Sequence, residues 1–217
     1  MESSARNAPS GARPVWQRVA ILLVALGALG STGPSSEEVP RVALEEARKA
    51  TGELVAGTRS ELLKAIEASG PLRAIVVCKY TVPEIASATS RRFGARITRV
   101  SLRPRNPSLG WGDSWEQKVM MSFDERLARG EKPATLEHAE VVAEPLGKFV
   151  RYMRALPMAP ECAHCHGPAE QMSEPVRNQL AHDYPHDRAT GITVGKLRGA
   201  VSFKKPLCDF GPSPSCP

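Results

Sequence analysis

The chain has 217 residues, of which 41% are hydrophobic, so it is long enough for one domain with a real core, and two large domains would be crowded. Its net charge of +6 does not indicate a nucleic-acid partner, because the basic residues are scattered and no aromatic platform is interleaved with them. A basic face is still able to steer an acidic redox partner or an anionic membrane surface.

The N-terminus has the layout of an export signal. An apolar run at 19–30 follows three arginines and ends in small residues. The run is shorter than the ~20 residues that a membrane-spanning helix needs. We therefore expect 1–33 to be a signal peptide with its linker, with an uncleaved anchor as the alternative. The rest of the chain is expected outside the cytoplasm, in the periplasm, with membrane contact only if the segment is uncleaved.

Three stretches have the spacing of helices. Apolar residues in 41–69 recur at helical intervals up to a Gly-Pro pair, which predicts a long amphipathic helix. The apolar run 72–77 leads into a second predicted helix, in which Pro83 is tolerable only near the first turn. Residues 113–130 open with an Asp/Ser cap and Glu116 and repeat large apolar residues every four positions, so a third helix is predicted there.

The strands are predicted mainly in the second half. Residues 96–102 alternate imperfectly and are read as a strand, followed by an extended loop. Residues 139–158 are expected to be two strands joined by a turn at 144–148. In the second of them, one face should carry Phe149, Arg151 and Met153, and the other Val150, Tyr152 and Arg154.

Two short β-rich runs, 192–194 and 200–203, are expected after a polar segment, with a glycine-containing turn between them. The Pro- and Ser-rich tail, 207–217, is expected to have little structure of its own. Helices first and antiparallel strands later indicate an α+β domain, which we place at 36–206.

Cys162, Cys165 and His166 match C-x-x-C-H, the attachment signature of c-type haem. Two thiols add to the two vinyl groups of one porphyrin, and the adjacent histidine lies under the iron as its proximal ligand. His164 should point away from the iron and has no ligand role. Because c-type haem is attached outside the cytoplasm, the export signal supports one covalent haem c independently. A strained local disulfide, or cysteines that stay reduced, is the structural alternative.

Zinc is the main chemical alternative. His182 and His186 are spaced H-x-x-x-H, and such a pair after C-x-x-C is a zinc pattern. The gap from Cys165 is slightly long, however, and Pro185 interrupts the helix that would align the two histidines. We expect both histidines at the surface or beside the haem, and keep a zinc-stabilised structural module as an alternative.

The second axial position of the iron decides the function. Methionine there raises the potential, thiolate lowers it, and an open position permits gas binding or peroxide chemistry. Composition alone does not choose, and the late position of the haem motif does not suit the common all-helical cytochrome c fold. The candidates are Met120, Met121, Met153, Met158, Met172, His182, His186 and Cys78.

The order of the motifs resembles a bacterial family catalogued as a domain of unknown function, whose members are similar to PAS domains and carry one covalent haem with His/Cys axial ligation. Arg-Asn-Pro, Trp-Glu and Tyr-Pro-x-Asp elements in register with C-x-x-C-H make the resemblance specific. The chain departs from the family pattern at 109–113, where the family more often has a shorter run. The matching segments are 78–86, 101–116, 162–167, 184–202 and the strand pair before the cluster.

The resemblance implies a PAS-like domain in which Cys162 and Cys165 are the thioether anchors, His166 is the proximal ligand and Cys78 the distal ligand. Cys78 is also the cysteine left over if Cys208 and Cys216 pair across the tail, a pairing that stays open because a mobile tail holds two thiols poorly. Without the resemblance, a buried small hydrophobe is the favoured interpretation of Cys78.

These features together predict an exported, low-potential haem protein that acts in electron transfer or redox sensing rather than catalysis, because a six-coordinate iron has no open site. Reduction that weakens the bond from the iron to Cys78 would shift the distal helix and report redox state to an unknown redox partner or sensor output protein. The alternative is a haem peroxidase or gas-binding protein in which Cys78 is unbound and His182 or His186 serves the distal pocket.

Overall fold

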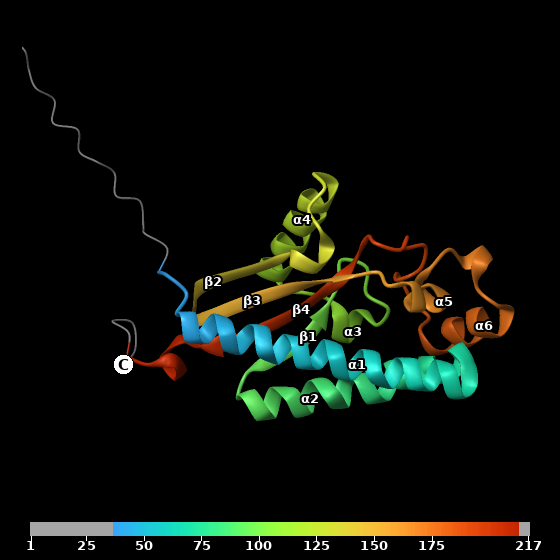
Figure 1. Ribbon diagram of the computed structural model, residues 1–217, viewed down its shortest axis with the longest axis horizontal. Coiled ribbons are helices and arrows are strands. Elements are labelled where there is room, and N and C mark those ends of the chain that lie inside the picture. The colour runs from blue at the N-terminus through green and yellow to red at the C-terminus, as the bar shows by residue number, and fades with distance from the viewer. Residues whose placement is uncertain (1–36, 213–217) are drawn as a thin grey trace, which may run out of the picture. The chain divides into compact units, whose positions relative to one another are not determined.

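Four antiparallel strands form one sheet in the order β1-β4-β3-β2 (Figure 1). The computed structural model describes residues 37–212, so the predicted signal segment, 1–33, lies outside the described residues. Helices and strands occur together in one chain, which confirms the α+β class. The strands are β1 (Arg96–Val100), β2 (Glu137–Glu144), β3 (Gly147–Pro157) and β4 (Leu197–Pro206).

Helices cover both faces of this sheet (Figure 1). α1 (Arg41–Val76) and α2 (Val82–Phe93) lie on one face, and α4 (Ser114–Ala128) lies on the other. All three predicted helices are therefore confirmed. Shorter elements are the π-helix Val77–Thr81, the α-helices α3 (Pro107–Gly110), α5 (Ala163–His166) and α6 (Glu174–Asp183), and the 3₁₀ turns Pro133–Thr135, Pro160–Cys162, Ala169–Gln171 and Leu207–Phe210.

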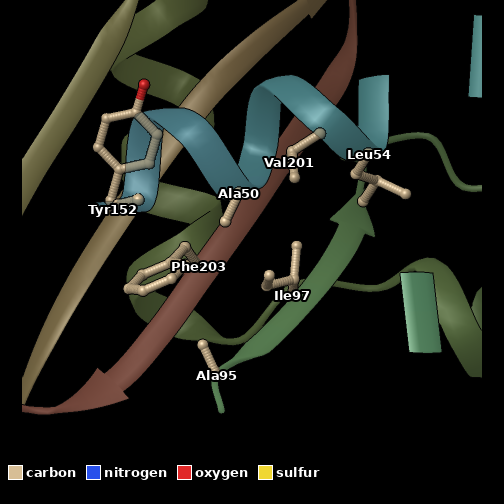
Figure 2. Close-up of a cluster of buried hydrophobic side chains, with 8 residues drawn as sticks. Ala50, Leu54, Ala95, Ile97, Tyr152, Val201 and Phe203 are labelled. Atoms are coloured by element: carbon tan, nitrogen blue, oxygen red, sulfur yellow. The ribbon is translucent and has the colours of Figure 1, made fainter. Parts of the chain in front are cut away.

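α1 packs on the sheet through small side chains. Ala47 and Ala50 are fully buried, and this lets the helix backbone lie close to the larger side chains that rise from the strands. Tyr152 on β3 fills the space under the helix (Figure 2). The buried cluster consists of Ala47, Ala50, Leu54, Ala95, Ile97, Tyr152, Val201 and Phe203.

The opposite face of the sheet is covered by α4. Met120 and Phe123 of this helix are fully buried against Met153 of β3. Because side chains alternate along a strand, Tyr152 and Met153 face opposite layers, and the predicted alternation of β3 is confirmed.

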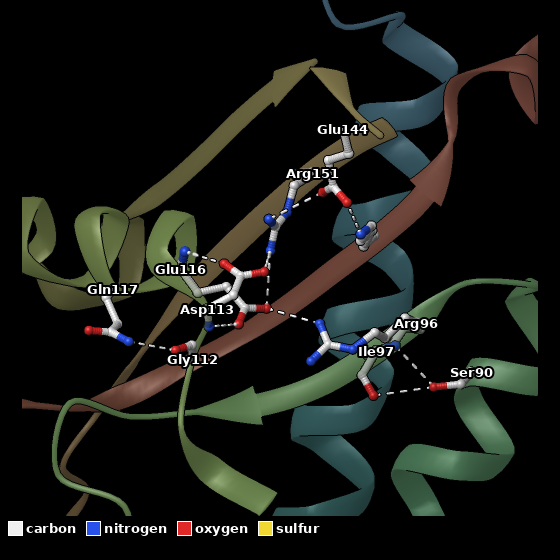
Figure 3. A network of polar contacts seen from close by, with 10 residues as sticks. Ser90, Arg96, Ile97, Gly112, Asp113, Glu116, Gln117, Glu144 and Arg151 are labelled. Carbon is white, nitrogen blue, oxygen red and sulfur yellow. Dashed lines mark hydrogen bonds and ion pairs between the residues drawn. The ribbon is translucent and has the colours of Figure 1, made fainter. Parts of the chain in front are cut away.

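α4 begins where the sequence predicted it, and its start is tied to a buried ion network. Asp113 and Glu116 form a reciprocal capping box, which satisfies donors that a helix start otherwise leaves unpaired. Arg151, only 3% exposed, donates to Asp113 Oδ2 over 2.7 Å and lies 3.4 Å from Glu116 and from Glu144 (Figure 3). Its guanidinium also stacks 4.3 Å above the ring of Trp115.

A second polar group connects α1 to the β2–β3 hairpin. Arg48 Nε donates to Glu137 Oε1 over 3.0 Å, and the Tyr152 hydroxyl donates to Glu137 Oε2 over 2.7 Å. The hydrogen bond from Arg48 holds the pKa of the Glu137 carboxyl below its ordinary value, against the opposing effect of burial, and Tyr152 lowers it further.

The lowered pKa of Glu137 predicts that part of the stability of the fold is lost in acid. A carboxyl whose pKa is lower in the folded protein stabilises the fold above its unfolded pKa of ~4.3, and the contribution is lost as the pH falls through the folded pKa. Glu137→Gln should lower the free energy of unfolding by about 1–2 kcal/mol at neutral pH. The loss should shrink in denaturant titrations as the pH falls below ~4.3, where the unfolded carboxyl becomes protonated, and disappear below the lower folded pKa.

The control for this prediction is Glu125→Gln, which removes an exposed carboxylate from α4. That variant should follow the wild-type pH profile. A Glu137→Gln profile parallel to the wild type at every pH would contradict the expected role of the Glu137 charge.

Two predictions about the C-terminal region are wrong. Residues 192–194 are not a strand, because Gly191 and Gly195 on either side adopt φ values of 68° and 86°, which interrupt an extended chain. The start of the predicted tail, 207–210, is a 3₁₀ turn that buries Leu207 against the α1 side of the sheet. Cys208 is in a disulfide, and Cys216 lies outside the described residues, so their pairing stays a prediction.

α6 lies in the polar segment after the cysteine cluster, where no helix was predicted. Its apolar residues Val176 and Leu180 pack with Met172 on Ile75 near the end of α1. Within 37–212, no helix combines the length and the apolar character needed to span a membrane.

Candidate functional site

The cysteine cluster occupies a tight turn directly after β3. Cys162 ends a 3₁₀ turn that Pro160 begins, and Cys165 and His166 belong to the single-turn helix α5. A side chain at Gly167 would place its Cβ only 2.7 Å from the carbonyl oxygen of Ala163. The glycine after the motif therefore lets the turn close immediately behind His166.

Cys78 lies on the helical path between α1 and α2. Gly70, with φ of 74° and ψ of −174°, kinks α1, and the chain then passes through the π-helix Val77–Thr81 into α2. Pro83 stands in the first turn of α2, as predicted. Its ring would clash with the carbonyl four residues earlier in a regular α-helix, and the wider π-turn relieves this clash. Such π-turns are frequent at functional sites.

The two regions meet at one pair of adjoining cavities, of about 230 and about 570 Å³. Cys78 and His166 line both of them, and Cys162 and Cys165 line the smaller one. The structure thus brings together all four residues that the sequence assigned to the site. The shared lining is Cys78, Arg99, Arg105, Leu156, His166, Tyr184 and Arg198.

One wall of the smaller cavity is apolar. The stripe of α1 that begins at Leu54 in the core continues as Leu62 and Ile66 along the cavity. The sequence predicted this stripe correctly as an apolar face. Leu54 and Val55 contact both the core cluster and the cavity, whereas Leu62 and Ile66 line the cavity and are not part of that cluster.

His166 is held in one orientation by the chain around it. Its Nδ1 lies 2.7 Å from the carbonyl oxygen of Ala189, so Nδ1 carries the proton and Nε2 is left as the basic nitrogen. Burial lowers the pKa of His166 well below its ordinary value, and the charges of Arg198 and Arg105 lower it further. The ring is therefore a neutral imidazole, the form that binds metals.

A ring of hydrogen bonds supports the carbonyl that fixes His166. The backbone N–H of Ala189 donates to Asp187 Oδ1 over 2.7 Å, and Arg105 Nε donates to Asp187 Oδ2 over 3.0 Å. Arg105 also donates to the carbonyl oxygen of Cys165. The Arg-Asn-Pro and Tyr-Pro-x-Asp motifs therefore meet beside His166.

The three thiols at the site are free. Burial raises the pKa of Cys162, and it raises the pKa of Cys165 to about 11. Cys78 lines the smaller cavity together with both of them. The local disulfide considered as an alternative is therefore absent, and the two cysteines of the motif are neutral thiols in an apolar setting.

The zinc alternative does not fit this geometry. The side chain of His182 is 81% exposed, His186 is also exposed, and neither residue lines the cavities beside Cys162 and Cys165. Across 37–212 there is no group of three or more His, Cys, Asp or Glu side chains able to hold a metal ion. The same positions exclude His182 and His186 from a distal pocket over His166. His164 is exposed at the cavity rim.

Among the proposed sixth ligands, only Cys78 lines either of these two cavities. The methionines lie elsewhere, with Met120 and Met153 in the core on the α4 side and Met172 against α6. Met158 is buried, whereas Met121 is 49% exposed.

Two arginines at the site, Arg99 and Arg198, were missed by sequence reasoning. The only signal was that Arg99 shares a strand face with the core residue Ile97, where an apolar side chain would be expected. Arg198 Nε is buried and has no hydrogen-bond partner. Burial lowers the pKa of Arg198 to about 9, and repulsion from Arg99 and Arg105 lowers it further.

A family model and a solved structure are similar to this chain. The family model Tll0287-like, described as Tll0287, matches residues 36–206. The crystal structure of the cyanobacterial heme-protein Tll0287 is similar with a TM-score of 0.54 and 23% sequence identity, covering 76% of this chain and 92% of that chain. At this identity the likeness shows a shared fold. No curated protein matches the chain.

Proposed function

The chain belongs to the Tll0287-like family, and from this premise we propose that it is a c-type haem protein with His166 and Cys78 as the two iron ligands. Cys162 and Cys165 provide the thioether bonds. The observation that carries the proposal is that Cys78 and His166, far apart in sequence, line the same two cavities beside both free thiols of the motif. A solved structure of the same fold is that of a heme-protein.

The residues present suit a haem in their chemistry. His166 offers a neutral nitrogen in a fixed tautomer, and the apolar stripe at Leu62 and Ile66 suits a porphyrin face. The arginines that line the cavities suit its carboxylates. When bound, the haem supplies a one-electron couple whose potential depends on its axial ligands.

We assign the protein to electron transfer or redox sensing at low potential. A thiolate from Cys78 would donate electron density to the iron and favour the ferric state. With Cys78 and His166 both engaged, no ligand position is left for a substrate. The predicted signal segment 1–33 supports a periplasmic location. The partner there would be a redox protein or a sensor output protein. We assign the antiparallel sheet flanked by helices to a PAS-like architecture.

The sensing role depends on the segment that carries Cys78. The π-turn Val77–Thr81 is anchored to α6 by an ion pair in which Lys79 Nζ lies 2.8 Å from Asp183 Oδ1. Movement of Cys78 would therefore be passed to α6 through a neighbouring residue. This connection is the route by which the oxidation state would reach the surface.

Covalent attachment is the test of the proposal. When the full chain is exported together with the cytochrome c maturation machinery, the intact mass should exceed that of the polypeptide by one haem. The combined variant Cys162→Ala/Cys165→Ala should lose the added mass, because both thioether bonds are removed.

His164→Ala is the matched control, since it alters an exposed residue inside the same motif. It should retain the full haem mass. A wild-type product whose mass equals the bare polypeptide would overturn the proposal, as would stoichiometric zinc in a colourless sample.

A further inference from the structure

We propose that Arg99 and Arg198 form a clamp for the two propionate carboxylates of the haem. This inference rests on the proposed function and adds the residues that orient the porphyrin within the cavity. It assigns a binding role to two side chains of the sheet that stand outside the C-x-x-C-H motif.

The two arginines reach the cavities from adjacent strands. Arg99 is on β1 and Arg198 is on β4, and these strands are paired antiparallel. Both side chains line both cavities, as do Cys78 and His166. A porphyrin held by His166 and the motif cysteines would therefore share these cavities with the guanidinium groups of Arg99 and Arg198.

The acidic side chains near the cavities are already engaged. Asp187 accepts from Arg105, Asp183 pairs with Lys79, and Glu161 lies 2.8 Å from Arg59. In the part of the chain that the structure describes, neither Arg99 nor Arg198 has an ion-pair partner. Asp187 acts on Arg198 only at a distance, while Arg99 and Arg105 repel it, so a ligand that brings carboxylates into this cavity is favoured.

Arg198 is held ready for such a ligand. Its Nη1 donates to Ser101 Oγ over 3.2 Å, and Ser101 Oγ donates back to the carbonyl oxygen of Arg198 over 2.9 Å. This contact orients the guanidinium, while its buried Nε has no acceptor. The planar fork of an arginine binds a carboxylate with two parallel hydrogen bonds, which a lysine does not do.

The test uses the mature holoprotein and resonance Raman spectroscopy of the propionate bending modes. Arg198→Gln and Arg99→Gln should each shift a propionate mode, and the double variant should shift both. Arg198→Lys should give an intermediate shift, because it keeps the charge and loses the fork. The midpoint potential should fall in the glutamine variants, since a positive charge near the iron disfavours the ferric state.

Arg91→Gln is the matched control. It removes one positive charge from an exposed side chain of α2 that does not line the cavities. Its Raman modes should be those of the wild type. Circular dichroism of every variant separates a local change from a loss of fold. If Arg198→Gln does not fold, the propionate modes of Arg198→Lys still test the role of Arg198.

Three outcomes distinguish a failure of the arginine clamp from a failure of the proposed haem site. Unchanged propionate modes in variants that carry haem normally would overturn the clamp and leave the proposed function standing. A Raman or potential shift on adding inorganic phosphate to the wild type would assign the arginines to an exogenous anion, which also overturns it. A wild-type chain without haem would instead overturn the proposed function.

Discussion

Replacing Cys78 with alanine is expected to leave the haem attached and to raise its midpoint potential by on the order of 0.2 V, a fraction of the ~0.8 V that axial ligands span. Attachment persists because the thioether bonds depend on Cys162 and Cys165. The potential rises because the ferric state loses a thiolate donor. Absorption spectroscopy should show loss of the thiolate-ligated spectrum, and redox titration should give the shift.

Val76→Ala provides the comparison for Cys78→Ala, because it trims an exposed side chain two residues away on the same helical path. That variant should keep the wild-type spectrum and potential. If Cys78→Ala also kept both, Cys78 would be a packing residue, and the low-potential assignment would fail with it. A clearly positive potential in the wild type would have the same consequence.

Replacing Arg151 with methionine is expected to destabilise the fold by about 3–5 kcal/mol, the usual cost of removing one member of a buried ion network. Glu116 is fully buried and Arg151 is 3% exposed, so the variant leaves the glutamate charge with less compensation. Arg96 contacts Glu116 over 3.1 Å but is itself half exposed. Denaturant unfolding at neutral pH measures the loss as a lower midpoint.

The comparison variant is Arg41→Met, which breaks the exposed pair of Arg41 with Glu45 on α1. Exposed pairs of this kind contribute about 0–1 kcal/mol, so its unfolding midpoint should stay near that of the wild type. Equal effects of Arg151→Met and Arg41→Met would show that the buried network contributes no more than a surface pair.

The elements that the sequence predicted correctly are those in which short-range pattern decides structure. The apolar spacing of 41–69 and the cap at Asp113 are local properties, and both helices begin close to the expected positions. The alternation that separates Tyr152 from Met153 is local in the same way. The grouping of Cys78 with the motif was implied by the family resemblance. In the structure, Cys78 and the motif residues line the same cavity.

The parts that were not predicted depend on contacts between distant segments. Ala189 contributes a backbone carbonyl to His166, and a side-chain pattern carries no information about that. Residues 192–194 have the composition of a strand, but Ile192 N–H donates to the carbonyl oxygen of His166 and joins this loop to the cluster. In the sequence, Arg198 is one of many scattered cations. Its burial results from the packing of whole elements and therefore could not be predicted.

The separation of Cys78 from Cys162 along the chain implies an order of assembly. Cys162 and Cys165 lie within one short turn, so in the proposed haem protein an attachment enzyme would reach both thiols before the domain has folded. Cys78 lies on the π-turn that follows α1 and contacts α6 through Lys79, so it would join the site only after these elements have packed together. If the proposed ligation holds, haem attachment and binding of the Cys78 thiolate would be successive events, and the thiolate signature in the absorption spectrum would report completed folding.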